Sequence, residues 1–442
     1  MNGNAYNGMI FLTQGIDELT AAQKMALLTR SESEDDSIRV ATAGLVADVV
    51  SRGDSALFEM ALGFDGVQLE SLEVPRSVLH TAVDSLDRDL LRALERAIQN
   101  IESVQRAFLP TIAETSPEPG ILVGRRPDPL DSVGVYAPGG SAAYPSSVLM
   151  GAVPARVAGV REVILCSPPG PTGLPSQAVL AAAELAGVHR VFAIGGAGAI
   201  AAMAYGTHSV PRVDRIVGPG NAYVAEAKLQ VARVVAIDSP AGPSELLVIA
   251  DSNANPDAVV HEVLAQAEHD PRSVVVVVTI GQAAARAIIE RLISALPSQR
   301  RRGIIEESLR TRGAVLWAAD MAEAIAFSND FAPEHLLLAV SSAKNLLPRL
   351  RNAGTIFVGE RSSVAFGDYM TGANHVLPTG GRARSYSGLS VLDFIRWTTY
   401  QVISAEAAAG LAQDVGLFAD AEGLPAHAAA ARQWAHQGAQ QQ

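Results

Sequence analysis

The sequence is poor in cysteine and has no excess of basic residues. Its 442 residues include a single cysteine, Cys166, which excludes an internal disulfide framework and a zinc cluster built from thiolates. Cys166 ends the apolar run 163–166, where we expect a small buried side chain rather than a nucleophile. The formal net charge of −12 argues against general nucleic-acid binding, because such binding needs a basic surface.

Long hydrophobic segments are also missing. The longest apolar run, Val274–Ile280, is interrupted by Thr279 and is too short to cross a bilayer. Residues Met1–Ala5 contain no basic region leading into an apolar segment, so no secretory signal is visible. With 48% hydrophobic and 18% charged residues, the composition is that of a well-packed globular protein. We expect a cytoplasmic protein that binds neither membranes nor nucleic acid.

Residues 1–125 are predicted to form a mainly helical N-terminal region. Apolar residues recur at spacings of three and four, which is typical of amphipathic helices, along Ala21–Arg30, Ser37–Ser51, Ser55–Leu62, Arg76–Ser85 and Arg88–Ala107. No group of titratable residues stands out here. We therefore expect this region to be a scaffold or a dimerisation element.

Residues 126–237 alternate short apolar runs with helical patterns. Strands are predicted at Ser132–Tyr136, Glu162–Cys166, Arg190–Ile194 and Asp214–Val217, and helices at Ser146–Ala158, Ser176–Ala186, Ala197–Ala204 and Ala222–Ala232. This alternation is typical of a doubly wound parallel sheet. In such sheets ligands bind outside the carboxyl ends of the strands.

Three glycine-rich loops follow these strands, at Ala137–Ser141, Gly195–Ala199 and Gly218–Asn221. Each loop lets the backbone approach a ligand closely and offers amide donors to phosphate at the start of a helix. None is a complete dinucleotide-binding fingerprint, and each alone is explained equally well as a tight turn. Together, on one edge of one sheet, they favour a nucleotide or dinucleotide site.

Residues 238–380 repeat the alternation less regularly, and residues 381–442 are predicted to be a helical tail. In the second block the expected strands are Ser244–Ala250, Ser273–Thr279, Ala314–Ala318 and Thr355–Val358, and the expected helices are Pro256–Gln266, Gln282–Ala295 and Met321–Asn329. In the tail the expected helices are Leu389–Tyr400, Glu406–Leu417 and Ala426–Gln437. The predicted fold is α/β, with two successive Rossmann-like parallel-sheet domains between a helical N-terminal and a small C-terminal extension. The similar rhythm of the two blocks suggests an internal duplication.

Gln266 and His269 are the most informative polar residues. We predict one amphipathic helix over His261–Asp270, in which these two side chains stand at i and i+3 on one face. A side-chain carbonyl oxygen beside a neutral imidazole is half of a four-coordinate divalent-metal site. The other half must come from elsewhere in the sequence.

Glu334 and His335 form a second polar group. Pro333 favours an extended conformation at Ala332, so we expect the pair to begin a new element in a turn. Adjacent Glu and His side chains point in different directions, which suits two proton-transfer roles around one substrate. A capping glutamate beside a packed histidine is the alternative interpretation.

Asp368, His375 and His427 are the remaining candidates. The stretch 367–379 is rich in glycine and ends near proline, which predicts an ordered loop, and Asp368 suits an oxygen ligand. His427 lies on a terminal helix that can dock into a cleft, including that of another subunit. Together with Gln266 and His269, Asp368 and either histidine would complete a zinc site, and spacing does not choose between them.

Seven stretches resemble the histidinol dehydrogenase family. They are Ala137–Ser141, Val217–Val224, Asp238–Glu245, Ala265–Asp270, Phe331–Leu336, Gly367–Thr379 and Glu422–His427. The resemblance runs from roughly residue 35 to residue 430, in consistent order and spacing. It implies oxidation of L-histidinol to L-histidine in two NAD⁺-dependent steps through an aldehyde, by a homodimer with shared active sites.

The resemblance also implies roles for individual residues. One zinc ion per subunit is expected to be held by Gln266, His269, Asp368 and His427, the last from the partner chain, and to orient the substrate. The resemblance makes Glu334 and His335 the catalytic pair, in which His335 takes the hydroxyl proton and Glu334 activates water. The zinc ligands and His335 are also expected to contact the substrate, and so are Ser244, His375 and Glu422.

Tyr136, Asn221 and Gly198 match positions that contact NAD in the family. Gly198 is a departure, because many relatives carry glutamine there, and one hydrogen bond to NAD is left unaccounted for. Three other functions compete with this interpretation. They are a paralogous NAD-dependent dehydrogenase of another small alcohol, such as a sulfonated diol, a zinc hydrolase that uses Glu334 as base, and a non-catalytic dimeric binding protein.

Overall fold

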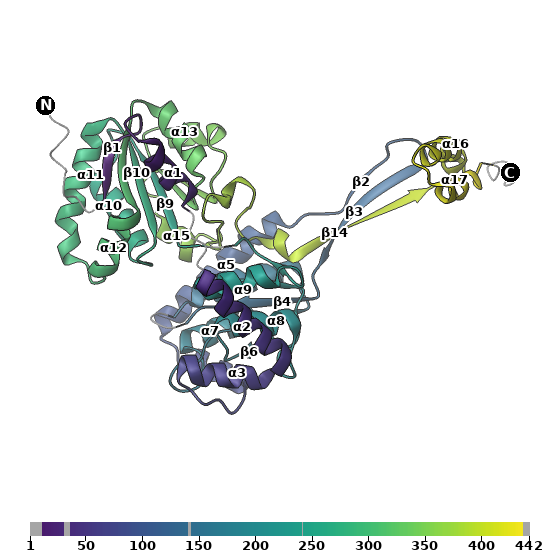
Figure 1. Ribbon diagram of the computed structural model, residues 1–442, viewed down its shortest axis with the longest axis horizontal. Helices are drawn as coiled ribbons and strands as arrows, with labels where there is room; N and C mark the ends of the chain where they lie inside the picture. Colours follow the sequence, from purple (N-terminus) through teal and green to yellow (C-terminus); the bar gives the residue numbers. More distant parts are fainter. Residues whose placement is uncertain (1–10, 31–35, 140–142, 241, 436–442) are drawn as a thin grey trace. The chain divides into compact units, whose positions relative to one another are not determined.

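The computed structural model describes residues 11–30, 36–139, 143–240 and 242–435. Internal packing divides the chain into two compact units (Figure 1). The first unit comprises Met1–Ala107 and Leu130–Phe394, and the second comprises Phe108–Pro129 and Ile395–Gln442. The four sequence ranges predicted above as domains stay a prediction.

The first unit contains two sheets, and the smaller one is a five-stranded parallel sheet in the order β6-β5-β4-β7-β8. Its strands are β4 (Ser132–Tyr136), β5 (Glu162–Cys166), β6 (Arg190–Phe192), β7 (Arg215–Val217) and β8 (Ala236–Ile237). The central strand β4 is buried on both faces except at its first residue, because helices cover both sides of a parallel sheet. The strands and helices predicted between residues 132 and 232 are confirmed to within two residues at their ends.

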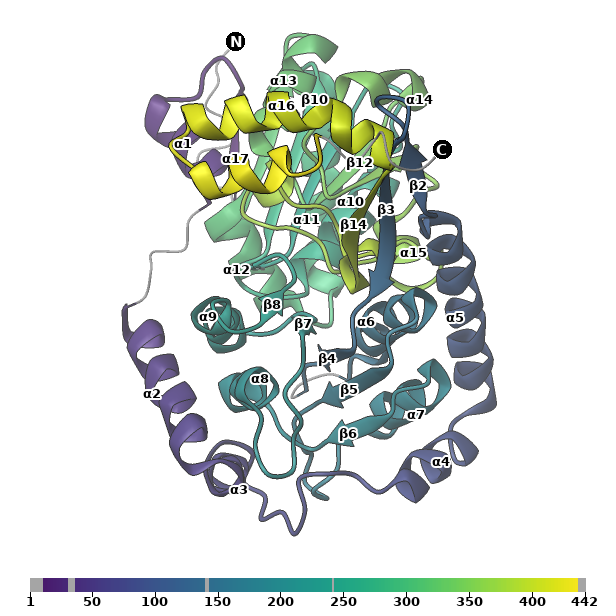
Figure 2. The ribbon, with the colours of Figure 1, turned by 90° about the vertical axis from the view of Figure 1, so that its right-hand side faces the viewer.

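Helices surround the smaller sheet on both faces (Figure 2). They are α6 (Pro145–Ala158), α7 (Gln177–Ala186), α8 (Gly196–Tyr205) and α9 (Ala222–Val231), together with α2 (Asp36–Arg52), α3 (Asp54–Met60), α4 (Arg76–Asp84) and α5 (Arg88–Phe108) from the N-terminal region. A short π-helix, η1 (Ala61–Asp65), continues α3. Most of the N-terminal helices thus pack as a scaffold, with α2 against α8 and α9 and with α4 against α7.

The larger sheet of the first unit has six parallel strands in the order β1-β11-β10-β9-β12-β13. The strands are β1 (Leu12–Gly15), β9 (Glu245–Ala250), β10 (Val274–Ile280), β11 (Gly313–Ala318), β12 (His335–Ala339) and β13 (Thr355–Val358). Its helices are α1 (Ala21–Thr29), α10 (Pro256–Ala267), α11 (Gln282–Ala295), α12 (Arg302–Arg312), α13 (Met321–Phe331), α14 (Ala343–Leu346) and α15 (Val364–Tyr369), with 3₁₀ turns η2 (Leu296–Ser298), η3 (Leu347–Arg349), η4 (Arg382–Arg384) and η5 (Val391–Phe394).

The two sheets share one strand order. Numbered from their first α/β strands, β4 and β9, both run 3-2-1-4-5, and β1 adds an edge strand to the larger sheet. In each sheet the first three strands are added toward one edge and the next two toward the other edge. The strand order therefore reverses between β4 and β7 in the smaller sheet and between β9 and β12 in the larger sheet. The repeated order supports the internal duplication predicted from the sequence.

The second unit contains a three-stranded antiparallel sheet and two helices, in the order β14-β3-β2. Its elements are β2 (Ala113–Thr115), β3 (Ile121–Pro129), β14 (Ile395–Ile403), α16 (Ala405–Ala421) and α17 (Pro425–Arg432). The predicted helix Leu389–Tyr400 is wrong, because nine residues of β14 pair with β3. The segment is rich in β-branched and aromatic residues, and a partner strand far away in sequence decides such cases. The C-terminal extension is therefore not purely helical.

Candidate active site

The pair Glu334 and His335 lies at the amino end of β12, between β9 and the edge strand β13 of the larger sheet. Both residues are buried, with 5% and 4% of their surface exposed. The His335 Nδ1 atom lies 2.8 Å from the backbone oxygen of Glu245. Because a carbonyl oxygen can only accept, Nδ1 carries the proton and Nε2 carries the lone pair. This Nε2 atom is buried and has no hydrogen-bond partner among the described residues.

Burial moves the pKa values of this pair in opposite directions. It lowers the pKa of His335 to about 4, and His375 and His269 nearby add to this effect. Burial raises the pKa of Glu334 well above its usual range, and the carboxylates of Glu245 and Asp368 add to the shift. The site therefore holds a neutral imidazole with a free lone pair next to a carboxyl group that binds its proton tightly.

Glu245, the first residue of β9, links this pair to the N-terminal region. Its backbone N–H donates to Glu334 Oε2 at 2.7 Å, and its own carboxylate accepts from Gly380 N at 2.7 Å. The buried Arg30 guanidinium lies 2.8 Å from Glu245 Oε1. Arg30 also donates to the backbone oxygen of Phe331 at 2.8 Å and stacks over its ring. Neither Arg30 nor Glu245 was predicted from the sequence as a residue of the site.

Asp368 and His375 face the same pair. Asp368 Oδ1 lies 3.8 Å from His335 Nε2, and His375 Nδ1 donates to the backbone oxygen of Asp368 at 2.9 Å. Burial raises the pKa of Asp368 to about 7, and the Glu262 carboxylate contributes to the shift. Burial also lowers the pKa of His375, so this imidazole is neutral at physiological pH.

Gln266 and His269 approach this group from α10. The helix is held beside α15 because Glu262 Oε2 accepts from Val364 N at 3.1 Å. Gln266 is buried, and its Nε2 atom has no hydrogen-bond partner among the described residues. His269 is accessible to solvent, yet neighbouring protein removes enough water to lower its pKa. Both side chains are therefore uncharged and are able to bind a metal ion.

Two local predictions for these residues are wrong. The predicted helix over His261–Asp270 ends at Ala267, so that His269 lies in the bend that follows it. Asp368 lies on the short helix α15 rather than in a loop, and Val364 at the start of this helix packs into the core. Glycine and proline in that stretch mark the segment after α15 rather than Asp368 itself.

The remaining candidates are spread over both units. Ser244 precedes β9 and is half-buried, whereas Glu422 and His427 belong to the second unit and are exposed there. Within the described ranges, no three side chains of the His, Cys, Asp or Glu type are grouped to hold a metal ion. The first unit alone thus presents two such ligands, His269 and Asp368, together with the amide of Gln266.

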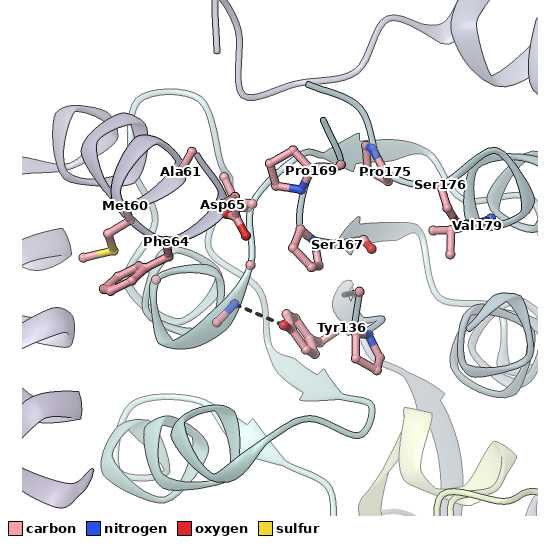
Figure 3. A pocket seen from close by; sticks show the side chains of 18 of the residues that line it. Met60, Ala61, Phe64, Asp65, Tyr136, Ser167, Pro169, Pro175, Ser176 and Val179 are labelled. Atoms are coloured by element: carbon pink, nitrogen blue, oxygen red, sulfur yellow. Dashed lines mark hydrogen bonds between the residues drawn. The ribbon is translucent and has the colours of Figure 1, made fainter. Parts of the chain in front are cut away.

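A large cavity of about 1170 Å³ lies at the carboxyl edge of the smaller sheet (Figure 3). The residues that follow β4, β5, β6 and β7 line it, and α3 and η1 close one side. Tyr136, whose hydroxyl accepts from Gly196 N at 3.0 Å, and Asn221, which caps α9, both line the cavity. The cavity is therefore at the predicted dinucleotide edge; residues 140–142 of the first glycine loop lie outside the described part of the chain.

Gly198 also lines this cavity, near the start of α8. A Cβ atom at this position would lie 2.7 Å from the sulfur of Met60 and 3.3 Å from Leu57. The space that a side chain at position 198 would need is thus filled by α3. Met60, from the N-terminal region, therefore forms the part of the cavity wall that a side chain at position 198 would otherwise form.

Comparisons with known proteins agree with this arrangement. The family model described as histidinol dehydrogenase matches residues 28–434. The histidinol dehydrogenase of Methanosarcina barkeri is 44% identical over 96% of this chain and 98% of its own length. That of Chromobacterium violaceum is 45% identical over 93% and 95%. The crystal structure of the enzyme from Elizabethkingia anophelis is similar with a TM-score of 0.92 at 33% identity, over 96% of this chain and 98% of that one.

Proposed function

The chain belongs to the histidinol dehydrogenase family, NAD-dependent enzymes of histidine biosynthesis, and we propose that it oxidises L-histidinol to L-histidine through L-histidinal at the site around His335. The observation that carries the assignment of this site is the buried, unpartnered Nε2 lone pair of His335. A base that is neutral, fixed in one tautomer and free of internal hydrogen bonds is what alcohol oxidation requires.

In the first oxidation, removal of hydride from the alcohol carbon requires loss of the hydroxyl proton. His335 Nε2 accepts that proton, while the hydrogen bond from Nδ1 to the Glu245 carbonyl holds the ring in place. Asp368 Oδ1 lies 3.8 Å from Nε2 and Glu334 Oε2 lies 3.5 Å from Nδ1, so a negative charge on either carboxylate stabilises the imidazolium that forms. Proton transfer of this kind typically accelerates a reaction by about 10²- to 10⁴-fold.

In the second oxidation, water must add to the aldehyde carbon before the second hydride can leave. Glu334 suits the base role because its raised pKa makes its carboxylate, once formed, a stronger proton acceptor than an ordinary glutamate. The oxygen of this water ends in the carboxylate of L-histidine. NAD⁺ supplies the hydride acceptor in both steps.

The donors Gln266, His269 and Asp368 fit a zinc ion completed by the partner's His427. An amide oxygen, two imidazoles and a carboxylate form a donor set that zinc accepts. The Gln266 side chain is buried, and its Nε2 atom has no partner among the described residues, so this end of the amide is not held by the protein; the amide oxygen is the atom that would bind zinc. Bound zinc would supply a positive charge that orients the amine and imidazole of the substrate, and His375, Ser244 and Glu422 would complete the substrate contacts.

The cavity at the carboxyl edge of the smaller sheet suits NAD. It opens at the point where the strand order reverses, between β4 and β7, which is where dinucleotides bind in doubly wound sheets. Its glycine loops offer backbone amides to the pyrophosphate, and Tyr136 and Asn221 line it. The shared 3-2-1-4-5 order supports the description of both sheets as Rossmann-like domains.

A homodimer with shared sites fits the surface of the second unit. This small unit exposes large apolar side chains, namely Trp397, Val402, Ile403, Val415, Leu417, Phe418, Leu424 and Trp434. Such a surface is typical of a protein–protein contact. The cytoplasmic location stays a prediction from the sequence; no helix in the described part of the chain has the length and apolarity to span a membrane.

The direct test is NADH formation by the purified protein with L-histidinol. We expect two molecules of NADH per L-histidinol and L-histidine as the product. Turnover of a sulfonated diol without turnover of L-histidinol would instead favour the paralogous dehydrogenase. Zinc-dependent hydrolysis with no NAD⁺-dependent reaction would favour a hydrolase.

Mixed dimers test the shared site. His427→Ala should lower zinc content, whereas His335→Ala should leave it near one per subunit and remove turnover. Co-refolding the two inactive variants should restore part of the activity, because one of the two sites in a mixed dimer then has every group intact. Absence of any rescue would show that each site is built from one chain.

A further inference from the structure

Asp65 is distinctive in the wall of the large cavity. Among the described residues that line it, Asp65 alone carries a formal charge, and the others are apolar, glycine, proline, hydroxyl or amide residues. Asp65 ends η1, the π-helical turn that continues α3. Figure 3 shows its carboxylate reaching from this turn toward the space above Tyr136.

The cavity wall contains no lysine or arginine in its described part. The pyrophosphate of a dinucleotide can rely on backbone amides at glycine-rich helix starts. The additional 2′-phosphate of NADP⁺, in contrast, is typically bound by an arginine, whereas a carboxylate binds the free ribose hydroxyl of NAD⁺. The charge pattern of this cavity therefore matches NAD⁺ and opposes NADP⁺.

The position of Asp65 along the cavity points to the adenosine half of the dinucleotide. The chain after η1 is bound to β6, since Val74 N donates to Val191 O and Ala193 N donates to Leu72 O, both at 2.8 Å. Asp65 thus lies at the β6 end of the sheet edge.

The catalytic groups are linked to the β4 side of the smaller sheet. The loop that carries His375 is joined to α6 by a 2.7 Å hydrogen bond from Asn374 Nδ2 to Met150 O, and α6 follows β4. Since the nicotinamide must face His335 and its neighbours, the adenosine ribose is left at the β6 end, beside Asp65.

We propose that Asp65 accepts a hydrogen bond from the adenosine ribose of NAD⁺ and excludes NADP⁺ by like-charge repulsion. This inference rests on the proposed function, because it uses the location of the nicotinamide. Asp65 is accessible to solvent, although the protein around it removes enough water to raise its pKa, and the described residues offer it no ion-pair partner. Its carboxylate is therefore free to accept a hydrogen bond from a ligand in the cavity.

The test compares dissociation constants for NAD⁺ and NADP⁺, measured by calorimetry on the full-length zinc-loaded enzyme without L-histidinol. We expect the unchanged enzyme to bind NADP⁺ at least about 100-fold more weakly than NAD⁺. In Asp65→Asn, NAD⁺ should bind about 10-fold more weakly, since a hydrogen bond to a charged group is lost, and NADP⁺ should bind more tightly. Asp65→Arg should reverse the preference.

Asp84→Asn is the matched control, because it makes the same chemical change at an exposed residue at the end of α4 that does not line the cavity. It should leave both constants unchanged. Melting temperatures should agree among all four proteins, because Asp65 is not part of the core. Equal affinity of the unchanged enzyme for the two dinucleotides, or an unchanged ratio in both Asp65 variants, would overturn the inference. Failure of the proposed function would appear separately, as intact NAD⁺ binding without NADH formation from L-histidinol.

Discussion

The two sheets of the first unit have the same strand order but use opposite edges. The smaller sheet presents its carboxyl edge, where glycine loops and Tyr136 surround the large cavity. The larger sheet presents its amino edge, where Glu245 opens β9 and His335 opens β12. A repeated topology therefore does not repeat its binding site, because function depends on the residues placed at an edge rather than on the edge itself.

The carboxyl edge of the larger sheet differs from both of these edges. A smaller cavity of about 410 Å³ lies there, between the residues that follow β9, β12 and β13. One of its two carboxylates, Asp251, already accepts hydrogen bonds from Ser341 N, Ser341 Oγ and Asn253 N, at 2.8 to 2.9 Å. Polar groups satisfied within the chain are not available to a ligand, in contrast to His335 Nε2 at the opposite edge.

The largest effect is expected from His335→Ala, which should separate the functions of the two edges. Loss of the base should lower kcat by about 100- to 10,000-fold, while the dissociation constant for NAD⁺ should not change. Steady-state NADH formation and a binding titration measure the two quantities. His335→Gln repeats the test with a side chain of similar volume, and the exposed His80→Ala should behave as the unchanged enzyme. A parallel loss of NAD⁺ affinity would contradict the division of labour between the edges.

Arg30→Met should destabilise the amino edge of the larger sheet. Removing one partner of a buried ion pair leaves the Glu245 carboxylate without compensation, which typically costs about 3–5 kcal/mol. Chemical denaturation measures the free energy of unfolding. The double variant Arg30→Met/Glu245→Gln should recover part of the loss, because no buried charge is left unpaired. Arg92→Met, at an exposed pair with Asp89, should change stability by less than about 1 kcal/mol, and an equal loss there would contradict the argument.

Gly218→Ala tests the carboxyl edge of the smaller sheet, where the glycine-rich loops lie. Gly218 has φ +118°, and a Cβ atom there would lie 2.1 Å from the backbone oxygen of Tyr136. Its backbone is fixed further by the buried Lys228–Asp238 ion pair, since Asp238 accepts from its N–H and Lys228 donates to its oxygen. We expect a loss of about 1–3 kcal/mol in the free energy of unfolding and weaker NAD⁺ binding.

Gly44→Ala is the matched control for that substitution. Gly44 lies within α2, and a Cβ atom there meets nothing within 4 Å. Alanine favours the helix by roughly 0.5–1 kcal/mol over glycine, so this variant should be slightly more stable. A loss of stability in both variants would mean that glycine content, rather than the strained position of Gly218, controls the result.

Much of the fold could be predicted from local pattern. The strands Ser132–Tyr136, Glu162–Cys166 and Thr355–Val358 have the predicted bounds. The first two are buried on both faces and are therefore continuous apolar runs between turn signals. β12 was not predicted as a strand, although five apolar residues, 336–340, follow His335. β14 was predicted as a helix because the partner that fixes it, β3, lies far away in sequence.

The types of side chain at the candidate site could be predicted from the sequence, but their contacts could not. Residue chemistry made Glu334, His335 and Asp368 candidates, the family resemblance implied their roles, and the structure places oxygens of Glu334 and Asp368 at 3.5 and 3.8 Å from the His335 ring nitrogens. Glu245 had a signal, as a charged residue opening the apolar run 246–250. Arg30 and Asp65 had none, because an exposed-looking helix end and a glycine-flanked turn acquire their roles only through tertiary contacts.

The smallest effect on stability is expected from Glu334→Gln, which removes a buried titrating acid from the amino edge of the larger sheet. Its pKa is raised in the folded protein, so above the ordinary glutamate pKa of about 4.3 the unfolded chain releases the proton more readily, and folding becomes less favourable as pH rises. Glutamine preserves the acceptor for Glu245 N without this cost. The variant should therefore match the unchanged enzyme in free energy of unfolding near pH 4 and exceed it near pH 8, by an amount on the order of 1 kcal/mol, while the aldehyde oxidation is lost. A stability difference that does not change with pH would contradict a buried, titrating Glu334.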